Sequence, residues 1–298
     1  MSWLGPPIDV RALFGTQHDA LIALLLDLRD DEWTRPTGCP GWSVQDIAAH
    51  VLGDHVGRLS RHRDQSRGQG PGAGETLSVF IDRINSEWVT AARRMSPRLL
   101  TDLLAHVGAQ VAAFWPTVDM HALGEPVSWA GPEPAPVWLD AARDFSEYWT
   151  HEQQICDATG RHGRTDPGFL TPVLDTFMRA LPYTLRDTGA APGTAVLVTV
   201  TGPCGGDWTC VRDTQRWRLD AAPLPRAAAS IEPTASVEPA ASIEPAASIE
   251  LDADTAWRLC TRGISPEQAA GRAHLDGDER LAAATLRIVS IIWTEPAS

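Results

Sequence analysis

The sequence predicts an α plus α+β protein, with a helical amino-terminal part and a smaller carboxy-terminal part that mixes strands and helices. Apolar residues recur at helical spacing in four stretches before residue 160. After residue 190, short segments alternate apolar and polar residues with a period of two. We therefore expect a four-helix bundle domain over residues 1–190 and a small α+β domain over residues 191–298.

The first two helices of the bundle have clear starting signals. Residues 8–29 place apolar side chains near one face, as in an amphipathic helix. After a loop rich in Gly and Pro, Ser43 and Asp46 have the spacing of a capping box, in which each residue satisfies the other's backbone amide. The second helix is thus expected to start near Val44 and to carry His50.

The third and fourth helices follow longer loops. A helical pattern runs from Phe80 to about Trp115, and Pro97 is expected to break it because proline cannot continue a helix interior. The fourth helix is expected over residues 137–159, ending at Gly160, a typical residue for a helix C-terminus.

The remaining segments predict a further helix and then the α+β domain. The helix is expected at about 168–187. Strands are expected at 195–201, 207–212 and 215–220, and helices at about 253–262 and 277–292. A hexapeptide repeat is inserted at 229–252, and its regularly spaced prolines disfavour central strands. We interpret it as a lengthened loop in which only the last copy, Ala247–Asp252, forms a strand.

Composition excludes several classes of function. The chain has 298 residues and a formal net charge of −13, so nucleic acid and anionic membranes, which need a basic surface, are not expected partners. Because the sequence contains no Lys, Schiff-base chemistry and a P-loop lysine are also excluded. The five cysteines form no Cys-x-x-Cys pair, and the amino terminus does not resemble a signal peptide. We expect a cytoplasmic protein without membrane spans.

Three residues have the character of metal ligands. Glu147 and His151 are four residues apart, so a helix places both side chains on one face. His50 lies on a separate predicted helix. Two imidazoles and a carboxylate would leave a tetrahedral zinc ion one open position, which is typical of a catalytic site. On spacing alone, a plain Glu–His ion pair stays an alternative.

Other catalytic constellations are weaker. The segment from His151 begins like a His-Glu-x-x-His protease motif, but Ile155 occupies the position of the second histidine. No Gly-x-Ser-x-Gly elbow is present. His55 is the nearest rival to His50, and five residues of helix turn it about 140° away, so the two are not expected to share one metal.

The segments that carry these ligands resemble a known family. Three segments are similar to the mycothiol-dependent maleylpyruvate isomerase family: Trp33–His50, Glu147–His151 and Asp157–Arg161. The first of them contains the sequence Pro-Gly-Trp-Ser. The resemblance implies a DinB-like metal-binding bundle in which His50, Glu147 and His151 are the ligands. It also implies a sterol-carrier-like second domain whose closing strand and helix match Ala270–Trp293.

The chain departs from the family pattern in places. Gln154 stands where many relatives carry an acidic residue. The repeat distorts the alignment beside the family's active-site arginine, a role that Arg258 or Arg262 could fill. The segment around Arg83 resembles a family segment that faces the site, although a solvated helical face is an equal alternative. We take Arg83 and Arg262 as the candidate catalytic residues.

The resemblance implies a zinc-dependent enzyme that uses the thiol mycothiol as cofactor. In an isomerase of this kind, a thiolate adds to the cis double bond of a maleylpyruvate-like unsaturated keto acid, and loss of the thiol after bond rotation gives the trans product. A thiol S-transferase acting on an electrophile is an alternative, as is a non-catalytic protein that binds a metal or an apolar ligand. The expected partners are small molecules, and the expected state is a monomer.

Overall fold

The computed structural model describes residues 3–66, 68–220 and 244–291 and confirms the α plus α+β class. Within these residues the chain forms two compact units. The helical unit comprises Ile8–Glu125 and Pro134–Thr165, and the sheet unit contains the described part of Asp166–Ile291 together with residues 3–7 and Pro126–Glu133. Residues 166–190 therefore fall in the sheet unit. The domain boundaries expected from the sequence, 1–190 and 191–298, stay a prediction.

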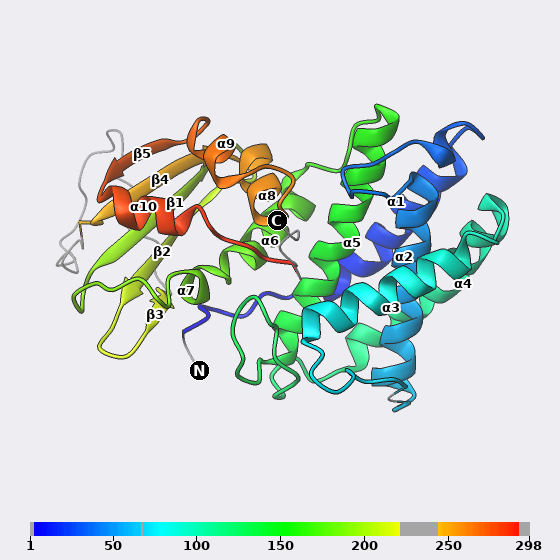
Figure 1. Ribbon diagram of the computed structural model, residues 1–298, viewed down its shortest axis with the longest axis horizontal. Coiled ribbons are helices and arrows are strands. Elements are labelled where there is room, and N and C mark those ends of the chain that lie inside the picture. The colour runs from blue at the N-terminus through cyan, green and yellow to red at the C-terminus, as the bar shows by residue number, and fades with distance from the viewer. Residues whose placement is uncertain (1–2, 67, 221–243, 292–298) are drawn as a thin grey trace, which may run out of the picture. The chain divides into compact units, whose positions relative to one another are not determined.

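The helical unit is built from five α-helices (Figure 1). They are α1 (Phe14–Leu26), α2 (Val44–Arg58), α3 (Leu77–Ala92), α4 (Pro97–Phe114) and α5 (Val137–Thr159). Short 3-10 turns cover Arg11–Leu13, Glu32–Thr34 and Trp115–Thr117, and a π-helical turn, Leu59–Arg63, extends α2.

Three predicted helix boundaries are confirmed. The Ser43 side chain accepts a hydrogen bond from the Asp46 amide, and the Asp46 carboxylate accepts one from the Ser43 amide, which completes the capping box of α2. Pro97 separates α3 from α4 and occupies the first turn of α4, where its missing amide proton costs nothing. Gly160 ends α5 with a φ of 70°, in the left-handed region that favours glycine.

Helix α2 lies at the centre of the helical unit, in contact with α3, α4 and α5. Its apolar residues Ile47 and Val51 are fully buried, as are Leu100 and Leu104 of α4. This burial fixes the rotation of α2 about its axis. Because His50 lies between Ile47 and Val51 in the sequence, the same packing directs its side chain to a defined neighbour, α5.

The sheet unit contains a mixed five-stranded sheet in the order β3-β2-β1-β4-β5. The strands are β1 (Ala195–Thr201), β2 (Gly206–Arg212), β3 (Trp217–Leu219), β4 (Ala247–Asp252) and β5 (His274–Gly277). β1 pairs with β4 in parallel, and the other neighbours are antiparallel. The helices of this unit are α6 (Pro167–Met178), α7 (Leu181–Thr184), α8 (Ala253–Cys260), α9 (Pro266–Ala270) and α10 (Glu279–Thr285).

One face of the sheet is apolar and buried. Val198 on β1 is in register with Ile249 on β4, and Val200 with Leu251. All four side chains are buried, and α8 and α10 contact β4. The alternation of buried and partly exposed residues along both strands is therefore the period-two pattern of a sheet with one covered face.

The strands expected at 195–201, 207–212 and 215–220 and the helix expected at 253–262 are confirmed, whereas the helix expected at 277–292 is the shorter α10. The last hexapeptide copy, Ala247–Asp252, is strand β4, while the copies before residue 244 lie outside the described residues. The helix expected at 168–187 is divided into α6 and α7. β5 was placed only through the family resemblance, because its four residues are exposed and carry no apolar alternation. Across the described part of the chain, no helix has the length and apolar content to cross a membrane.

Arg58, the last residue of α2, joins this helix to α5 through buried ion pairs. Its guanidinium is 3% exposed and binds Asp140 at 2.6 Å and Asp144 at 2.7 Å. The ring of Trp115 lies 4.8 Å from the guanidinium carbon, which adds a cation–π contact.

We expect Arg58→Met to lower the free energy of unfolding by about 3 kcal/mol, because it leaves buried carboxylates short of a partner. Urea denaturation would measure the change. Arg63→Met is the control, since Arg63 is exposed and pairs with exposed Asp64, so a change of about 0.5 kcal/mol or less is expected. Equal effects of the two substitutions would contradict a stabilising role for the Arg58 ion pairs.

Candidate metal centre

The structure brings His50, Glu147 and His151 together from two helices. His50 projects from α2, and Glu147 and His151 project from one face of α5. One ligand atom of each lies within 4.8 Å of the others. The His50 and His151 rings meet edge to face with centroids 4.7 Å apart, and Trp42 packs 5.0 Å from the His50 ring.

These separations suit a small divalent cation. Ligand atoms about 2.0–2.1 Å from a tetrahedral zinc ion lie about 3.4 Å from one another. His50 Nε2 and Glu147 Oε1 are already 3.5 Å apart. Asp54, one helical turn after His50, adds a third atom, because its Oδ2 is 3.3 Å from His50 Nε2. Apart from this approach to His50 Nε2, the buried Oδ2 has no hydrogen-bond partner among the described residues.

Gln154 orients His151 from the side opposite the other ligands. The Gln154 side-chain oxygen lies 2.8 Å from His151 Nδ1, so that nitrogen can donate to it and leave Nε2 as the ligand atom. Metal-bound histidines usually donate to a carboxylate or a carbonyl in this way. The amide oxygen of Gln154 thus fills the position for which the family resemblance implied an acidic residue. The same oxygen accepts a hydrogen bond from the Cys39 thiol at 3.3 Å.

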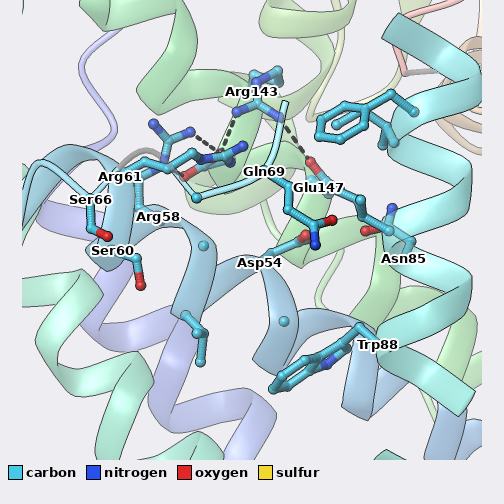
Figure 2. A pocket seen from close by; sticks show the side chains of 18 residues that line it. Asp54, Arg58, Ser60, Arg61, Ser66, Gln69, Asn85, Trp88, Arg143 and Glu147 are labelled. Carbon is cyan, nitrogen blue, oxygen red and sulfur yellow. Dashed lines mark hydrogen bonds and ion pairs between the residues drawn. The ribbon is translucent and has the colours of Figure 1, made fainter. Parts of the chain in front are cut away.

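Arg143 orients Glu147 in a similar manner. Its guanidinium donates to Glu147 Oε2 at 3.2 Å (Figure 2). It also donates to Asp140 and Asp144 at 2.8 Å. Since Arg143 engages Oε2, the other carboxylate oxygen of Glu147 is the one that faces His50.

The acidic and basic side chains around the candidate ligands do not balance in charge. The guanidinium groups of Arg58 and Arg143 pair with three carboxylates, those of Asp140, Asp144 and Glu147. A fourth carboxylate, that of Asp54, lies beside His50 and Glu147. With all four ionised and His50 protonated, the group still lacks one positive charge. Burial is the largest cause that raises the pKa of Asp54 to about 8; the charge of His50 opposes it, and the charge of Glu147 adds to it. A divalent cation beside Asp54 would supply the missing charge.

The two histidines differ in their affinity for protons. Burial disfavours the charged form of His50, but the charges of Asp54 and Glu147 outweigh burial and raise its pKa above the ordinary value. Burial and the neighbouring His50 lower the pKa of His151 to about 4. His151 is therefore neutral near pH 7, the form that binds a metal. At His50, because its pKa is raised, a proton competes with the metal up to a higher pH than at an ordinary histidine.

A cavity of about 440 Å³ opens beside Asp54 and Glu147 (Figure 2). It lies between α2 and α3, and its lining combines apolar and polar side chains. One wall is formed by Arg58, Arg143, Asp144 and Glu147. The carboxylate of Glu147, a candidate metal ligand, therefore borders the cavity directly. Of the three candidate ligands, Glu147 lines this space and the two histidines do not, so a small molecule in it approaches the candidate metal position from the Glu147 side.

The candidate catalytic arginines lie in different surroundings. Arg83 pairs with Glu75 at 2.9 Å and Glu87 at 3.2 Å and is not among the residues that line the cavity. Arg262, in the sheet unit, has a φ of 59° and donates to the backbone carbonyls of Arg287 and Ile288. The catalytic roles of Arg83 and Arg262 stay predictions. In the segment that contains Arg83, it is Asn85 that lines the cavity.

Sequence reasoning did not identify the residues that surround the ligands. Asp54 and the acidic and basic residues of α5 could have been found from their spacing, because His50 and Asp54 are four residues apart and so are Arg143 and Glu147. His55 instead packs on Tyr148, with ring centroids 4.6 Å apart, and is not part of the ligand group. Burial raises the pKa of the Cys39 thiol to about 11, so Cys39 is a thiol at neutral pH.

Residues 14–156, which contain all three candidate ligands, match the family of the mycothiol maleylpyruvate isomerase N-terminal domain. This part of the chain belongs to that family. Two uncharacterized proteins of Mycobacterium tuberculosis, from the CDC 1551 and H37Rv strains, are each 26% identical over 210 residues, covering 67% of this chain and 74% of theirs.

Two crystal structures are also similar, those of mycothiol-dependent maleylpyruvate isomerase and of one of its histidine-to-alanine mutants. Each is 13% identical and aligns with 89% of this chain and 91% of the other, with a TM-score of 0.49.

We expect Gln154→Leu to weaken metal binding by about 10- to 100-fold, because His151 loses the acceptor that orients its ring. Competition against a chromophoric chelator would measure the affinity. Gln154→Glu is the matched control, since it keeps an acceptor oxygen in place and should bind the metal at least as tightly as the parent. Unchanged affinity in Gln154→Leu would show that this hydrogen bond does not support the site.

The pKa of His50 predicts how metal affinity depends on pH. A proton on His50 competes with the metal, so affinity should fall as pH falls through the raised pKa of His50, and the fall should begin above pH 6.5. His151 should add to it only near pH 4. Asp54→Asn removes both the carboxylate that raises the pKa of His50 and a second group, with a pKa of about 8, that takes up a proton beside the site, so it should move the fall to lower pH. Chelator competition between pH 5.5 and 8 tests this, and identical pH profiles would refute it.

Proposed function

We propose that the protein is a metal-dependent enzyme that uses mycothiol, with His50, Glu147 and His151 as the metal ligands and zinc as the metal. The observation that carries the proposal is the convergence of these three side chains beside a cavity. The charge shortage around Asp54 supports a divalent cation. The family of residues 14–156 supports mycothiol as the thiol.

A divalent metal held by three protein ligands would bind the thiol sulfur in its open position and keep it as a thiolate near neutral pH. The protein's own groups prepare this position. Gln154 and Arg143 hold His151 and Glu147 in orientation. The apolar ring of Trp42 packs against His50. The cavity beside Glu147 gives a second small molecule access to the sulfur.

The reaction that this site supports best is addition of the thiolate to an electrophilic double bond. In the addition, a sulfur–carbon bond forms while the π electrons of the double bond move onto a conjugated carbonyl. Loss of the thiol after rotation about the resulting single bond gives cis–trans isomerisation of a maleylpyruvate-like unsaturated keto acid. The family name of the amino-terminal domain favours this outcome.

The second candidate is S-transfer, in which the adduct takes up a proton and the thioether is released. The mixed lining of the cavity favours it, because apolar side chains of α3 border a space larger than a seven-carbon acid needs. Incubation with mycothiol and maleylpyruvate distinguishes the two, since isomerisation gives the trans acid without consuming thiol, whereas transfer consumes one thiol for each thioether.

We expect His50→Ala and His151→Ala to lose bound metal and to lose thiol-dependent turnover by about 100-fold or more, because each removes one of three ligands. Elemental analysis of the purified proteins and a thiol-consumption assay would measure both effects.

The control is His106→Ala, because His106 is exposed on α4 and is not one of the grouped ligands. This variant should keep the metal and the activity of the parent. Full metal occupancy in either ligand variant would overturn the assignment of the metal centre. Full occupancy in the parent without any thiol-dependent reaction would instead support a metal-binding protein that is not an enzyme.

A further inference from the structure

The cavity beside the candidate metal centre has a strongly apolar wall. Phe80, Ile81, Ile84 and Trp88 of α3 line it. Trp88 is fixed in place, because its indole nitrogen donates to the Ala49 carbonyl at 2.7 Å. A Cβ atom at Gly53 would lie 2.7 Å from the Trp88 ring, so glycine at this position of α2 is what lets the indole approach. A ligand can therefore bury apolar surface against α3.

The arginines that line the described cavity differ in their ion-pair partners. Arg58 and Arg143 are buried and bound to carboxylates of α5. Arg61, in the π-helical turn after α2, is exposed at the rim and makes no ion pair or hydrogen bond with the described residues. Of the three arginines that line the described cavity, Arg61 is thus the one whose guanidinium is available to a ligand.

Gly57 keeps the space between Arg61 and the apolar wall open. A Cβ atom added at Gly57 would have a single neighbour within 4 Å, Arg61 Nη2 at 3.7 Å. Gly57 lies inside α2, where glycine is less favourable than a residue with a side chain. A side chain added at this position of α2 would meet no backbone atom at its Cβ and would occupy the cavity. Glycine leaves that space open.

We propose that this cavity binds an apolar electrophile with one acidic group, whose carbon skeleton lies along Ile84 and Trp88 and whose anion meets Arg61. This proposal rests on the proposed function, because it takes the cavity as the second-substrate site of the metal-bound thiol. A keto diacid needs two cationic partners, whereas the described residues of the lining offer one available guanidinium. The substrate class is therefore bulky, apolar and singly charged, which matches S-transfer better than isomerisation of a small diacid.

Binding can be tested without thiol or turnover, on the full-length, metal-loaded protein. The probe is anilinonaphthalenesulfonate, an apolar monoanion that fluoresces when it is buried. We expect phenylbutyrate, an apolar monoacid, to displace it and maleate, a small diacid, not to do so. Gly57→Leu should weaken probe binding about tenfold or more by filling the cavity. Arg61→Gln should weaken it about fivefold, and should leave binding of the neutral probe phenylnaphthylamine unchanged.

Matched variants control for effects on folding and on surface charge. Gly15→Leu adds the same side chain to α1 at a glycine with no neighbour within 4 Å, and Arg63→Gln removes an exposed charge that is not part of the lining. Both should bind the probe like the parent, and all four variants should keep their metal and their melting temperature.

Unchanged probe binding in Gly57→Leu, or displacement by maleate but not by phenylbutyrate, would overturn the proposed binding site. An equal loss of affinity for the neutral and the anionic probe in Arg61→Gln would also contradict it. If the binding results hold but no thiol-dependent reaction occurs, the proposed function fails while the ligand site stands.

Discussion

The helical unit depends on a buried group of charges between α2 and α5. Arg58 reaches across from the end of α2 to Asp140 and Asp144, and Arg143 continues the ion pairs along α5 to Glu147. Burying these charges is tolerable only because each has partners in good geometry. The same ion pairs set the relative position of the two helices, and so they set the distance between His50 on one and Glu147 on the other.

This arrangement links stability to the candidate chemistry. Arg143 neutralises part of the acidic cluster and simultaneously fixes the carboxylate of Glu147. The cluster is nevertheless left with more acidic than basic groups, and the excess is concentrated at Asp54, beside the candidate ligands. A fold optimised for stability alone would replace Asp54 with a neutral residue. Its presence is consistent with a site that has exchanged some stability of the apo form for cation affinity.

Local chemistry explains which features could be predicted from the sequence. The capping box at Ser43, the break at Pro97 and the end of α5 at Gly160 depend on a few adjacent residues, and the structure has all three. The ion pairs of Arg58 join residues more than 80 positions apart, so no local pattern reveals them. The cavity depends on how α2 and α3 pack, and the glycines that shape it carry no side-chain signal of their own. The grouping of His50 with Glu147 came from ligand chemistry and the family resemblance rather than from local pattern.

The hexapeptide repeat supplies strand β4 of the sheet through its last copy. In β4 the fifth residue of the repeat unit is Leu251, which is buried and in register with Val200 of β1. In the three preceding copies the equivalent residue is proline, at Pro233, Pro239 and Pro245. Proline at that place would remove a ladder amide and the leucine side chain together. The copy with leucine at the fifth position can therefore supply both the backbone amide and the apolar side chain that meet β1 at this place.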